Sequence, residues 1–187
     1  AADSIDGPVY CRILRGEVPR LFKTPLRVGE MRLLSQGSDV LIVTSGIATE
    51  EAMRAAGALR NAGLSIRHIH LSTIKPFDGT ELLDHIAAVR HGVVTLENHV
   101  TEGGIGSLVA ETMADNACGK RLVRLGLRDT FAHGGSRAYL MRYYGIDGLA
   151  LVAAAEGLVG RSLGISETDL SEARVDAVHS EAKAEAL

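Results

Sequence analysis

The sequence predicts an α/β fold: a three-layer, mostly parallel open sheet of about four parallel strands plus an edge strand, with helices on both faces. Short apolar runs, rich in β-branched residues and typical of strands buried on both faces, alternate with segments whose apolar residues recur at helical spacing. This alternation occurs about four times before the pattern changes, as expected for strands joined by crossover helices. Glycines close most of these segments and mark the turns.

Composition restricts the class of protein. The chain has 187 residues, 46% hydrophobic and 23% charged, which is typical of a globular domain plus an appendage. A net charge of −3 and only 4% aromatic residues argue against a nucleic-acid partner, and no apolar run approaches the roughly 20 residues that span a membrane. Cys11 and Cys118 stand far apart, so we expect reduced thiols in a cytoplasmic protein.

The chain divides into three predicted parts. Residues 1–26 combine a strand at 8–14 with an extended, proline-containing linker, and are expected to belong with a preceding domain. Because the chain starts with Ala and leads straight into this strand, we expect a piece of a longer protein. Residues 27–162 are expected to form the α/β domain, and residues 163–187 a terminal helix or tail.

The elements of the α/β domain follow in order. Apolar runs predict strands at residues 31–34, 39–45, 65–71, 93–96 and 121–127, the first of them at an edge. Helical spacing predicts helices at residues 49–62, 82–89 and 105–113 between the later strands. Two further helices, at 138–144 and 148–159, are expected to form a helical cap after the sheet, and Ser166 to Asp169 resembles a capping box.

The polar residues after the predicted strand at 93–96 form the first candidate site. Glu97, His99 and Glu102 fall at the carboxyl end of this strand, where open α/β sheets place their sites and partner contacts. Imidazole and carboxylate are metal ligands, but no further His or Cys lies nearby at helical spacing. We therefore expect no metal here and instead a polar rim that contacts another domain or subunit.

A glycine cluster at residues 103–106 follows this rim. Such a cluster at the start of a helix could hold a phosphate, but it lacks the dinucleotide-binding spacing and a Walker lysine. A tight turn between strand and helix is the favoured interpretation. His68 and His70 share one face of a predicted strand and are expected in the core or at an interface. No serine lies in a GxSxG elbow, so no catalytic residue is predicted.

Four segments, taken together, resemble a known family. They are residues 37–46, 72–78, 96–106 (Leu-Glu-Asn-His-Val-Thr-Glu-Gly-Gly-Ile-Gly) and the stretch that ends at 144–147. In this order they are similar to the C-terminal domain of transketolase and its thiamine-diphosphate relatives, which include 1-deoxyxylulose-5-phosphate synthase and the β chains of 2-oxoacid dehydrogenases. Residues 8–21 resemble the last strand of the family's pyrimidine-binding domain and the linker after it.

The resemblance implies a parent enzyme that moves a two-carbon ketol unit between sugar phosphates with thiamine diphosphate and Mg. The family holds both cofactors in its pyrimidine- and diphosphate-binding domains, whose GDG motif and glutamate do not appear in this chain. The resemblance thus implies that this fragment binds no cofactor or metal, is inactive alone, and serves in domain assembly and dimerisation. Its partners would be those domains and a homodimer or split-subunit partner.

Arg15 is the one residue expected to touch the sugar-phosphate substrate. A guanidinium beside Gly16 could present a fork to a phosphate, although a solvated arginine is the alternative from the residues alone. By resemblance it matches the family's phosphate-binding arginine. Two alternatives stay open: a 2-oxoacid dehydrogenase β-type chain, which Arg15 suits less well, and a stand-alone nucleotide- or effector-binding regulatory module, which would need the turn at Gly103 to bind its ligand.

Overall fold

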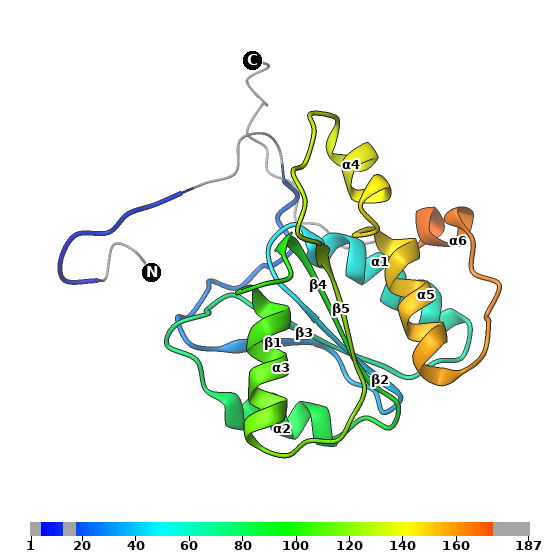
Figure 1. Ribbon diagram of the computed structural model, residues 1–187, viewed down its shortest axis with the longest axis horizontal. Coiled ribbons are helices and arrows are strands. Elements are labelled where there is room, and N and C mark those ends of the chain that lie inside the picture. The colour runs from blue at the N-terminus through cyan, green and yellow to red at the C-terminus, as the bar shows by residue number, and fades with distance from the viewer. Residues whose placement is uncertain (1–4, 13–17, 174–187) are drawn as a thin grey trace.

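The computed structural model describes residues 5–12 and 18–173. Its strands are β1 (Met31–Ser35), β2 (Val40–Thr44), β3 (Ile66–Leu71), β4 (Gly92–Val100) and β5 (Leu122–Leu127). They form one sheet in the order β1-β3-β2-β4-β5, in which β1 runs antiparallel to β3 and every other pair is parallel. The predicted mostly parallel sheet with one edge strand is confirmed, and helices cover both of its faces (Figure 1).

The helices are α1 (Ala48–Asn61), α2 (Gly79–Ala87), α3 (Ile105–Asp115), α4 (Arg137–Tyr143), α5 (Gly148–Val159) and α6 (Glu167–Glu172). The central strand β2 shows why its sequence is apolar throughout, because all of its residues are buried. Leu41 and Val43 pack towards α2 and α3, whereas Val40 and Ile42 pack towards α1 and α5. Each face of the sheet therefore carries its own hydrophobic core.

Local signals in the sequence set several helix boundaries. The Asp78 carboxylate accepts a hydrogen bond from the Thr80 amide and starts α2, and the Asp147 carboxylate does the same for α5. Gly160, with φ of 75°, ends α5 in the left-handed conformation that glycine adopts without strain. The capping box predicted at Ser166 is confirmed, since the Ser166 side chain accepts from the Asp169 amide and the Asp169 carboxylate accepts from the Ser166 amide.

Three local predictions need correction. The strand predicted at residues 8–14 is wrong for its described part, because residues 8–12 are exposed and have no strand to pair with among the described residues. Strand β4 continues to Val100 instead of ending at residue 96, because its pairing with β5 extends past a register shift. The predicted helical cap is also wrong for α5, which packs beside α1 in the layer over the sheet.

The predicted boundaries at residues 26 and 162 remain predictions. Residues 18–26 have little regular structure, as expected of a linker, and α6 begins the terminal segment. Residues 174–187 lie outside the described part. No helix in residues 5–12 and 18–173 combines the length and apolar character that crossing a bilayer requires.

Candidate functional site

The carboxyl edge of the sheet is organised by Glu97, near the end of β4. Its side chain is only 4% exposed. One carboxylate oxygen, Oε2, accepts a hydrogen bond from the Ile105 amide at 2.8 Å, and Oε1 accepts one from the Gly106 amide at 2.8 Å. These amides are the first of α3 and have no partner inside the helix. Glu97 thus caps α3 across the turn and places a negative charge at the positive end of the helix dipole.

The glycines make this contact possible. A Cβ on Gly104 would lie 2.0 Å from Glu97 Oε2, and a Cβ on Gly106 would lie 3.0 Å from Thr95 Oγ1 and 3.1 Å from the Arg124 side chain. The glycine cluster is therefore the tight strand-to-helix turn that the sequence predicts. A phosphate or diphosphate would have to displace the Glu97 carboxylate from these amides, so the turn does not fit that part of thiamine diphosphate.

The other two residues of the predicted rim lie on the surface. His99 and Glu102 are exposed, and His99 Nδ1 lies 2.9 Å from the Val100 carbonyl oxygen. The Thr101 hydroxyl donates a hydrogen bond to Glu102, which holds the pKa of that carboxyl below its usual value. Because Glu97 is buried and both of its carboxylate oxygens bond α3 amides, the predicted rim consists of one structural residue, Glu97, and two surface residues, His99 and Glu102. No group of three potential metal-ligating side chains occurs within the described ranges.

A second feature lies where residues 18–26, here named the strap, cross the same edge of the sheet. Arg32 of β1 donates hydrogen bonds to the Thr24 hydroxyl at 3.1 Å, to the Thr24 carbonyl oxygen at 3.0 Å and to the Pro25 carbonyl oxygen. The same guanidinium lies 4.7 Å from the centre of the Phe22 ring, in cation–π geometry. The Phe22 ring in turn packs against His70, with 4.9 Å between ring centres.

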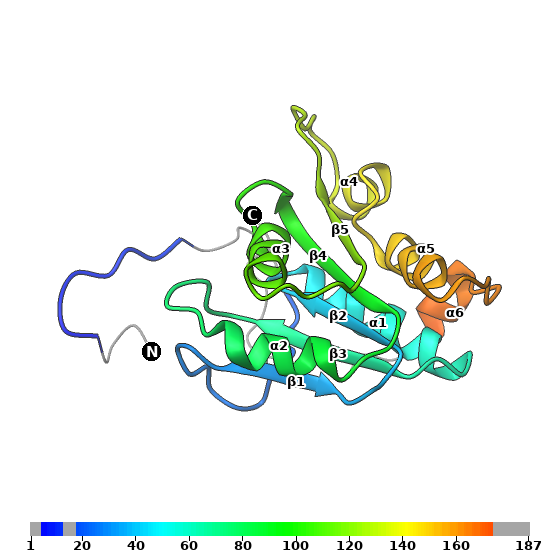
Figure 2. The same ribbon diagram turned by 60° about the horizontal axis from the view of Figure 1, so that its bottom comes forward.

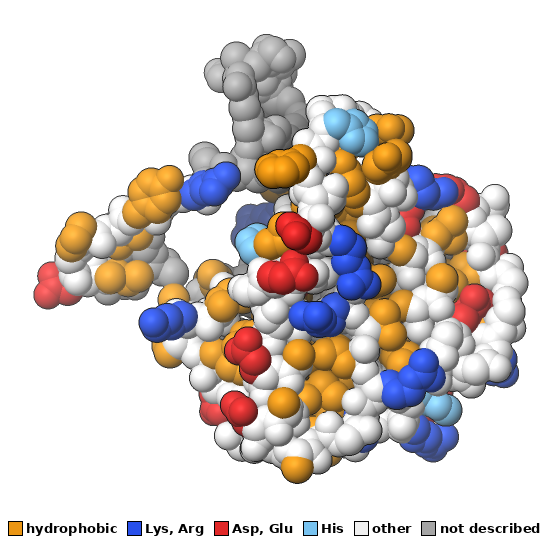
Figure 3. Space-filling model, in the orientation of Figure 1, with side chains coloured by type: hydrophobic (Ala, Val, Ile, Leu, Met, Phe, Trp, Pro, Cys, Tyr) orange, Lys and Arg blue, Asp and Glu red, His pale blue; other side chains and the backbone are white. Residues whose placement is uncertain are grey.

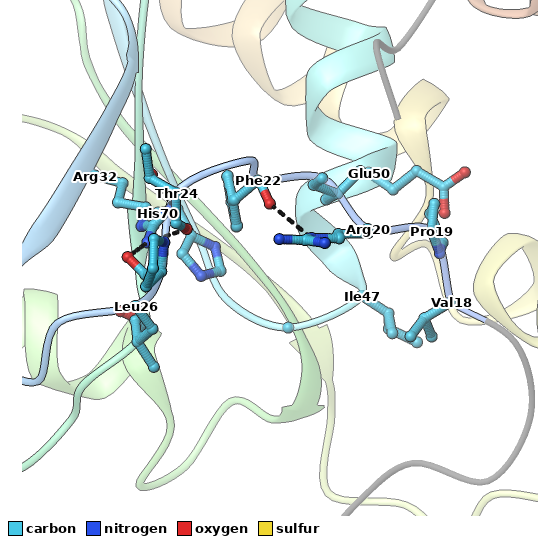
Figure 4. Close-up of a pocket in the computed structure, with 14 residues that line it drawn as sticks. Val18, Pro19, Arg20, Phe22, Thr24, Leu26, Arg32, Ile47, Glu50 and His70 are labelled. Atoms are coloured by element: carbon cyan, nitrogen blue, oxygen red, sulfur yellow. Dashed lines mark hydrogen bonds between the residues drawn. The ribbon is translucent and has the colours of Figure 1, made fainter. Parts of the chain in front are cut away.

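The strap lines an open cavity of about 530 Å³ against the start of α1 and the end of β3 (Figure 4). Its lining is mainly apolar, with Arg20, Arg32, Glu50 and His70 as the charged or titratable groups. Sequence reasoning treated this segment as a linker and missed the cavity. The available signal was the apolar cluster Val-Pro-Arg-Leu-Phe at residues 18–22, which is unusual for an exposed linker.

The two histidines of β3 lie in the core, which confirms one of the two predicted locations. His68 Nε2 lies 2.8 Å from the Thr44 hydroxyl, and His70 Nδ1 lies 2.8 Å from the Thr49 hydroxyl. Thr49 donates a hydrogen bond to Thr44 at 3.1 Å and joins the two pairs into a chain. Burial, reinforced by His70, lowers the pKa of His68 to about 3, and burial, reinforced by Arg32, lowers the pKa of His70 to about 4.

An aromatic cluster covers α4 and the loop before it. The His133 ring packs against the rings of Tyr139, Tyr143 and Tyr144, with centre-to-centre distances of 4.8 to 5.7 Å. Phe131, in the same loop, is fully exposed. The loop projects beyond the sheet in Figure 2, and Figure 3 shows hydrophobic side chains gathered around a histidine at this end. Exposed aromatic side chains of this kind are typical of protein interfaces.

Arg15, the predicted substrate contact, lies outside the described residues. The structure therefore neither brings it to the rim nor separates it from the rim.

Comparison with known proteins identifies the family. The family model for the transketolase C-terminal domain matches residues 29–150. The chain belongs to the transketolase C-terminal domain family. This domain assignment agrees with the resemblance found in the four sequence segments and with the doubly covered, mostly parallel sheet.

Individual relatives give the same result. A "putative transketolase C-terminal section" of Methanocaldococcus jannaschii is 35% identical over 146 residues, which cover 76% of this chain and 45% of that protein. The "6-deoxy-6-sulfo-D-fructose transketolase subunit SqwH" of Clostridium sp. strain MSTE9 is 37% identical over 83% of this chain and 48% of that protein. A 1-deoxy-D-xylulose-5-phosphate synthase of Chlorobium phaeovibrioides is 37% identical over 79% of this chain and 24% of that protein.

Among solved structures, a chain described as "split gene transketolase, inactive beta4 tetramer" superposes with a TM-score of 0.75 at 33% identity. The match covers 83% of this chain and 51% of that chain. The transketolase domain described here thus spans about half the length of the first curated relatives it matches.

Proposed function

We propose that this chain is the C-terminal part of a transketolase-type transferase that moves a two-carbon ketol unit between sugar phosphates, and that the chain itself serves in domain assembly and dimerisation. One observation carries the assembly role. The Glu97 carboxylate occupies the α3 amides, so the glycine turn at the ligand-binding edge of the sheet is closed by the chain's own side chain. The alternative of a nucleotide-binding regulatory module loses its proposed site by the same contact.

The parent's cofactors and substrate contact follow from the family. Thiamine diphosphate and Mg would be held by the pyrimidine- and diphosphate-binding domains of the parent. Arg15 remains the residue of this chain proposed to contact the substrate phosphate, because a guanidinium pairs with phosphate through two parallel hydrogen bonds. We also propose a cytoplasmic location, supported by the free thiols of Cys11 and Cys118.

The exposed side chains at the carboxyl edge are the proposed contacts for these partners. His99, near the end of β4, and Glu102, in the turn after it, are exposed, and Phe131 and Tyr143 are exposed beyond β5. A charged and aromatic surface of this kind suits a protein partner better than solvent. The split-gene neighbour supports a partner subunit, since that protein is described as an assembly of one chain type that is inactive.

The first experiment separates the domain from its parent. The purified chain, supplied with thiamine diphosphate and Mg, is assayed for ketol transfer before and after addition of the polypeptide that carries the pyrimidine- and diphosphate-binding domains. We expect no transfer by the chain alone and transfer after addition. Turnover by the chain alone would contradict the assembly role. Lack of complex formation between the two polypeptides in analytical ultracentrifugation would contradict it as well.

The rim is tested with a matched pair of variants. His99→Ala combined with Glu102→Ala removes the exposed rim residues, whereas His91→Ala removes an exposed histidine at the opposite edge of the sheet, just before β4. We expect the rim variant alone to weaken association with the partner polypeptide, by about tenfold if two rim contacts of about 0.7 kcal/mol each are lost. Equal association of both variants would remove His99 and Glu102 from the interface.

A second candidate parent is a 1-deoxy-D-xylulose-5-phosphate synthase. It is favoured by relatives of that name that match this chain as closely in identity as the transketolase-named ones do. Detection of 1-deoxy-D-xylulose 5-phosphate as the product of the assembled enzyme, without ketol transfer between sugar phosphates, would select this candidate.

A further inference from the structure

The cavity beneath the strap has the size and composition of a small-molecule site. Its volume of about 530 Å³ lies within the range of roughly 300 to 1,000 Å³ that is usual for ligand pockets. Apolar side chains from the strap form one wall, and Ile47 at the start of α1 contributes to the other. A few polar groups converge on this apolar space, as they do in sites that orient one compact ligand.

His70 supplies a polar group at the cavity. The residue is 8% exposed and lines the cavity. Its Nδ1 is engaged by the Thr49 hydroxyl, whereas Nε2 has no hydrogen-bond partner among the residues that the structure describes. Because the Thr49 hydroxyl donates to Thr44, the neutral His70 ring donates from Nδ1 to Thr49 and presents Nε2 as a hydrogen-bond acceptor at the cavity.

The charge balance of the cavity is positive. Arg20 and Arg32 both line it, and their guanidinium groups bond only hydroxyl and carbonyl oxygens of the strap. Within the described ranges neither has a carboxylate at ion-pair distance. Glu50, the one acidic residue of the lining, is paired with Arg54 at 3.1 Å and Arg137 at 3.6 Å, so its charge is already balanced.

The geometry points to a binding site for a small organic acid, with its carboxylate at Arg20 and its compact apolar body between Phe22 and Ile47. In Figure 4 the Arg20 guanidinium extends from the strap towards Phe22 and the His70 ring. A guanidinium binds a carboxylate through strong, charge-assisted hydrogen bonds. This site is separate from the glycine turn, and the inference does not depend on the proposed transferase activity.

Binding at this site would affect how the strap is held. One wall belongs to the strap and the other to the α/β body, so a bound acid contacts both. A ligand that binds only the docked arrangement stabilises that arrangement by mass action. The site therefore couples the concentration of an organic acid to the docking of the segment that precedes the domain.

Phenylacetate serves as the probe, with 2-phenylethanol as its uncharged counterpart. Both are titrated at millimolar concentration into the full chain, and binding is followed by isothermal titration calorimetry and saturation-transfer NMR. We expect saturable binding of phenylacetate, about tenfold tighter than that of 2-phenylethanol because only the acid makes the charge-assisted bonds. Arg20→Gln should abolish this preference. Arg27→Gln, a nearby exposed arginine outside the cavity lining, should leave it unchanged.

A second variant tests the location independently of charge. Ile47→Trp fills the cavity from the α1 side and should reduce phenylacetate binding at least fivefold, while circular dichroism confirms the fold. Equal affinity for the acid and the alcohol, unchanged affinity in Arg20→Gln, or absence of saturable binding to the folded wild-type chain would each overturn the inference. The ketol-transfer assay of the assembled enzyme is unaffected by any of these outcomes, so the two proposals fail separately.

Discussion

Replacement of Glu97 tests the central contact of the carboxyl edge. Glu97→Ala removes the carboxylate and leaves the Ile105 and Gly106 amides buried without their acceptor. Hydrogen bonds to a charged group contribute about 1.5 to 3 kcal/mol each, so two of them amount to about 3 to 6 kcal/mol. Relaxation of the turn and entry of water recover part of this, and we expect a loss of about 3 to 5 kcal/mol in the free energy of unfolding.

Glu97→Gln is the finer perturbation. It keeps the shape and one acceptor oxygen but turns an amide N–H₂ towards one of the two backbone amides, where donor meets donor. We expect about half the loss of the alanine variant. Because 1 kcal/mol shifts the melting temperature of a domain of this size by about 2 to 4 °C, the alanine variant should melt about 10 °C lower than the wild type.

The assay is chemical unfolding of the isolated chain at pH 7, followed by circular dichroism. The control is Glu102→Gln, which changes an exposed carboxylate only five residues further along the chain and should leave the midpoint unchanged. If Glu97→Ala unfolds at the same denaturant concentration as Glu102→Gln, the capping role is refuted. Glu97 would then belong with the partner-facing rim after all.

Three further predictions follow from the same structure. Gly104→Ala should unfold at a distinctly lower denaturant concentration than Gly119→Ala. The Cβ added at Gly104 would meet Glu97 Oε2, whereas a Cβ at Gly119 meets nothing within 4 Å. Equal unfolding midpoints would contradict the close approach of Gly104 to Glu97. The free energy of unfolding should decrease as the pH falls from about 6.5 towards 4, by up to about 1.4 kcal/mol per pH unit for each of His68 and His70. The lowered pKa values keep both rings neutral in the folded chain while the unfolded chain takes up protons, and His70→Gln should reduce the slope measured by urea unfolding across this range. Lys120→Met should lower the free energy of unfolding by about 1 to 2 kcal/mol in the same urea assay. The Lys120 ammonium donates to the carbonyl oxygens of Ile86, Ala87 and Val89 at the end of α2. Lys75→Met, at an exposed lysine, is the control.

The sheet could be predicted because its signals are local. Strand β2 is apolar on both faces, and glycines or capping side chains mark the ends of the helices around it. The hydrophobic periodicity and these boundary residues therefore agree with the observed packing. The end of β4 could not be predicted in this way. Residues 97–99 are polar and resemble a turn, but the strand continues through them because Val100 and Thr101 still pair with Leu127 of β5, a contact made across more than 25 residues.

The candidate site was predicted in position but not in detail. The carboxyl edge holds Glu97, His99 and Glu102 as expected, yet sequence spacing does not tell a buried cap from an exposed contact. The distinction depends on whether the residue points towards the next helix, and that depends on where the glycine turn places α3. The strap cavity was missed because its parts, Phe22, Arg32 and His70, come from three separate segments.

The family motif of residues 96–106 therefore has two physical parts. Glu97, Gly104 and Gly106 belong to a single arrangement: the Glu97 carboxylate accepts from the α3 amides, a side chain at Gly104 would collide with that carboxylate, and a side chain at Gly106 would crowd Thr95 and Arg124. His99 and Glu102 take no part in that interaction and remain exposed. A variant that changes the first set should act on folding, and one that changes the second should act on assembly. The measurement that separates them is unfolding of the isolated chain against binding of the partner polypeptide.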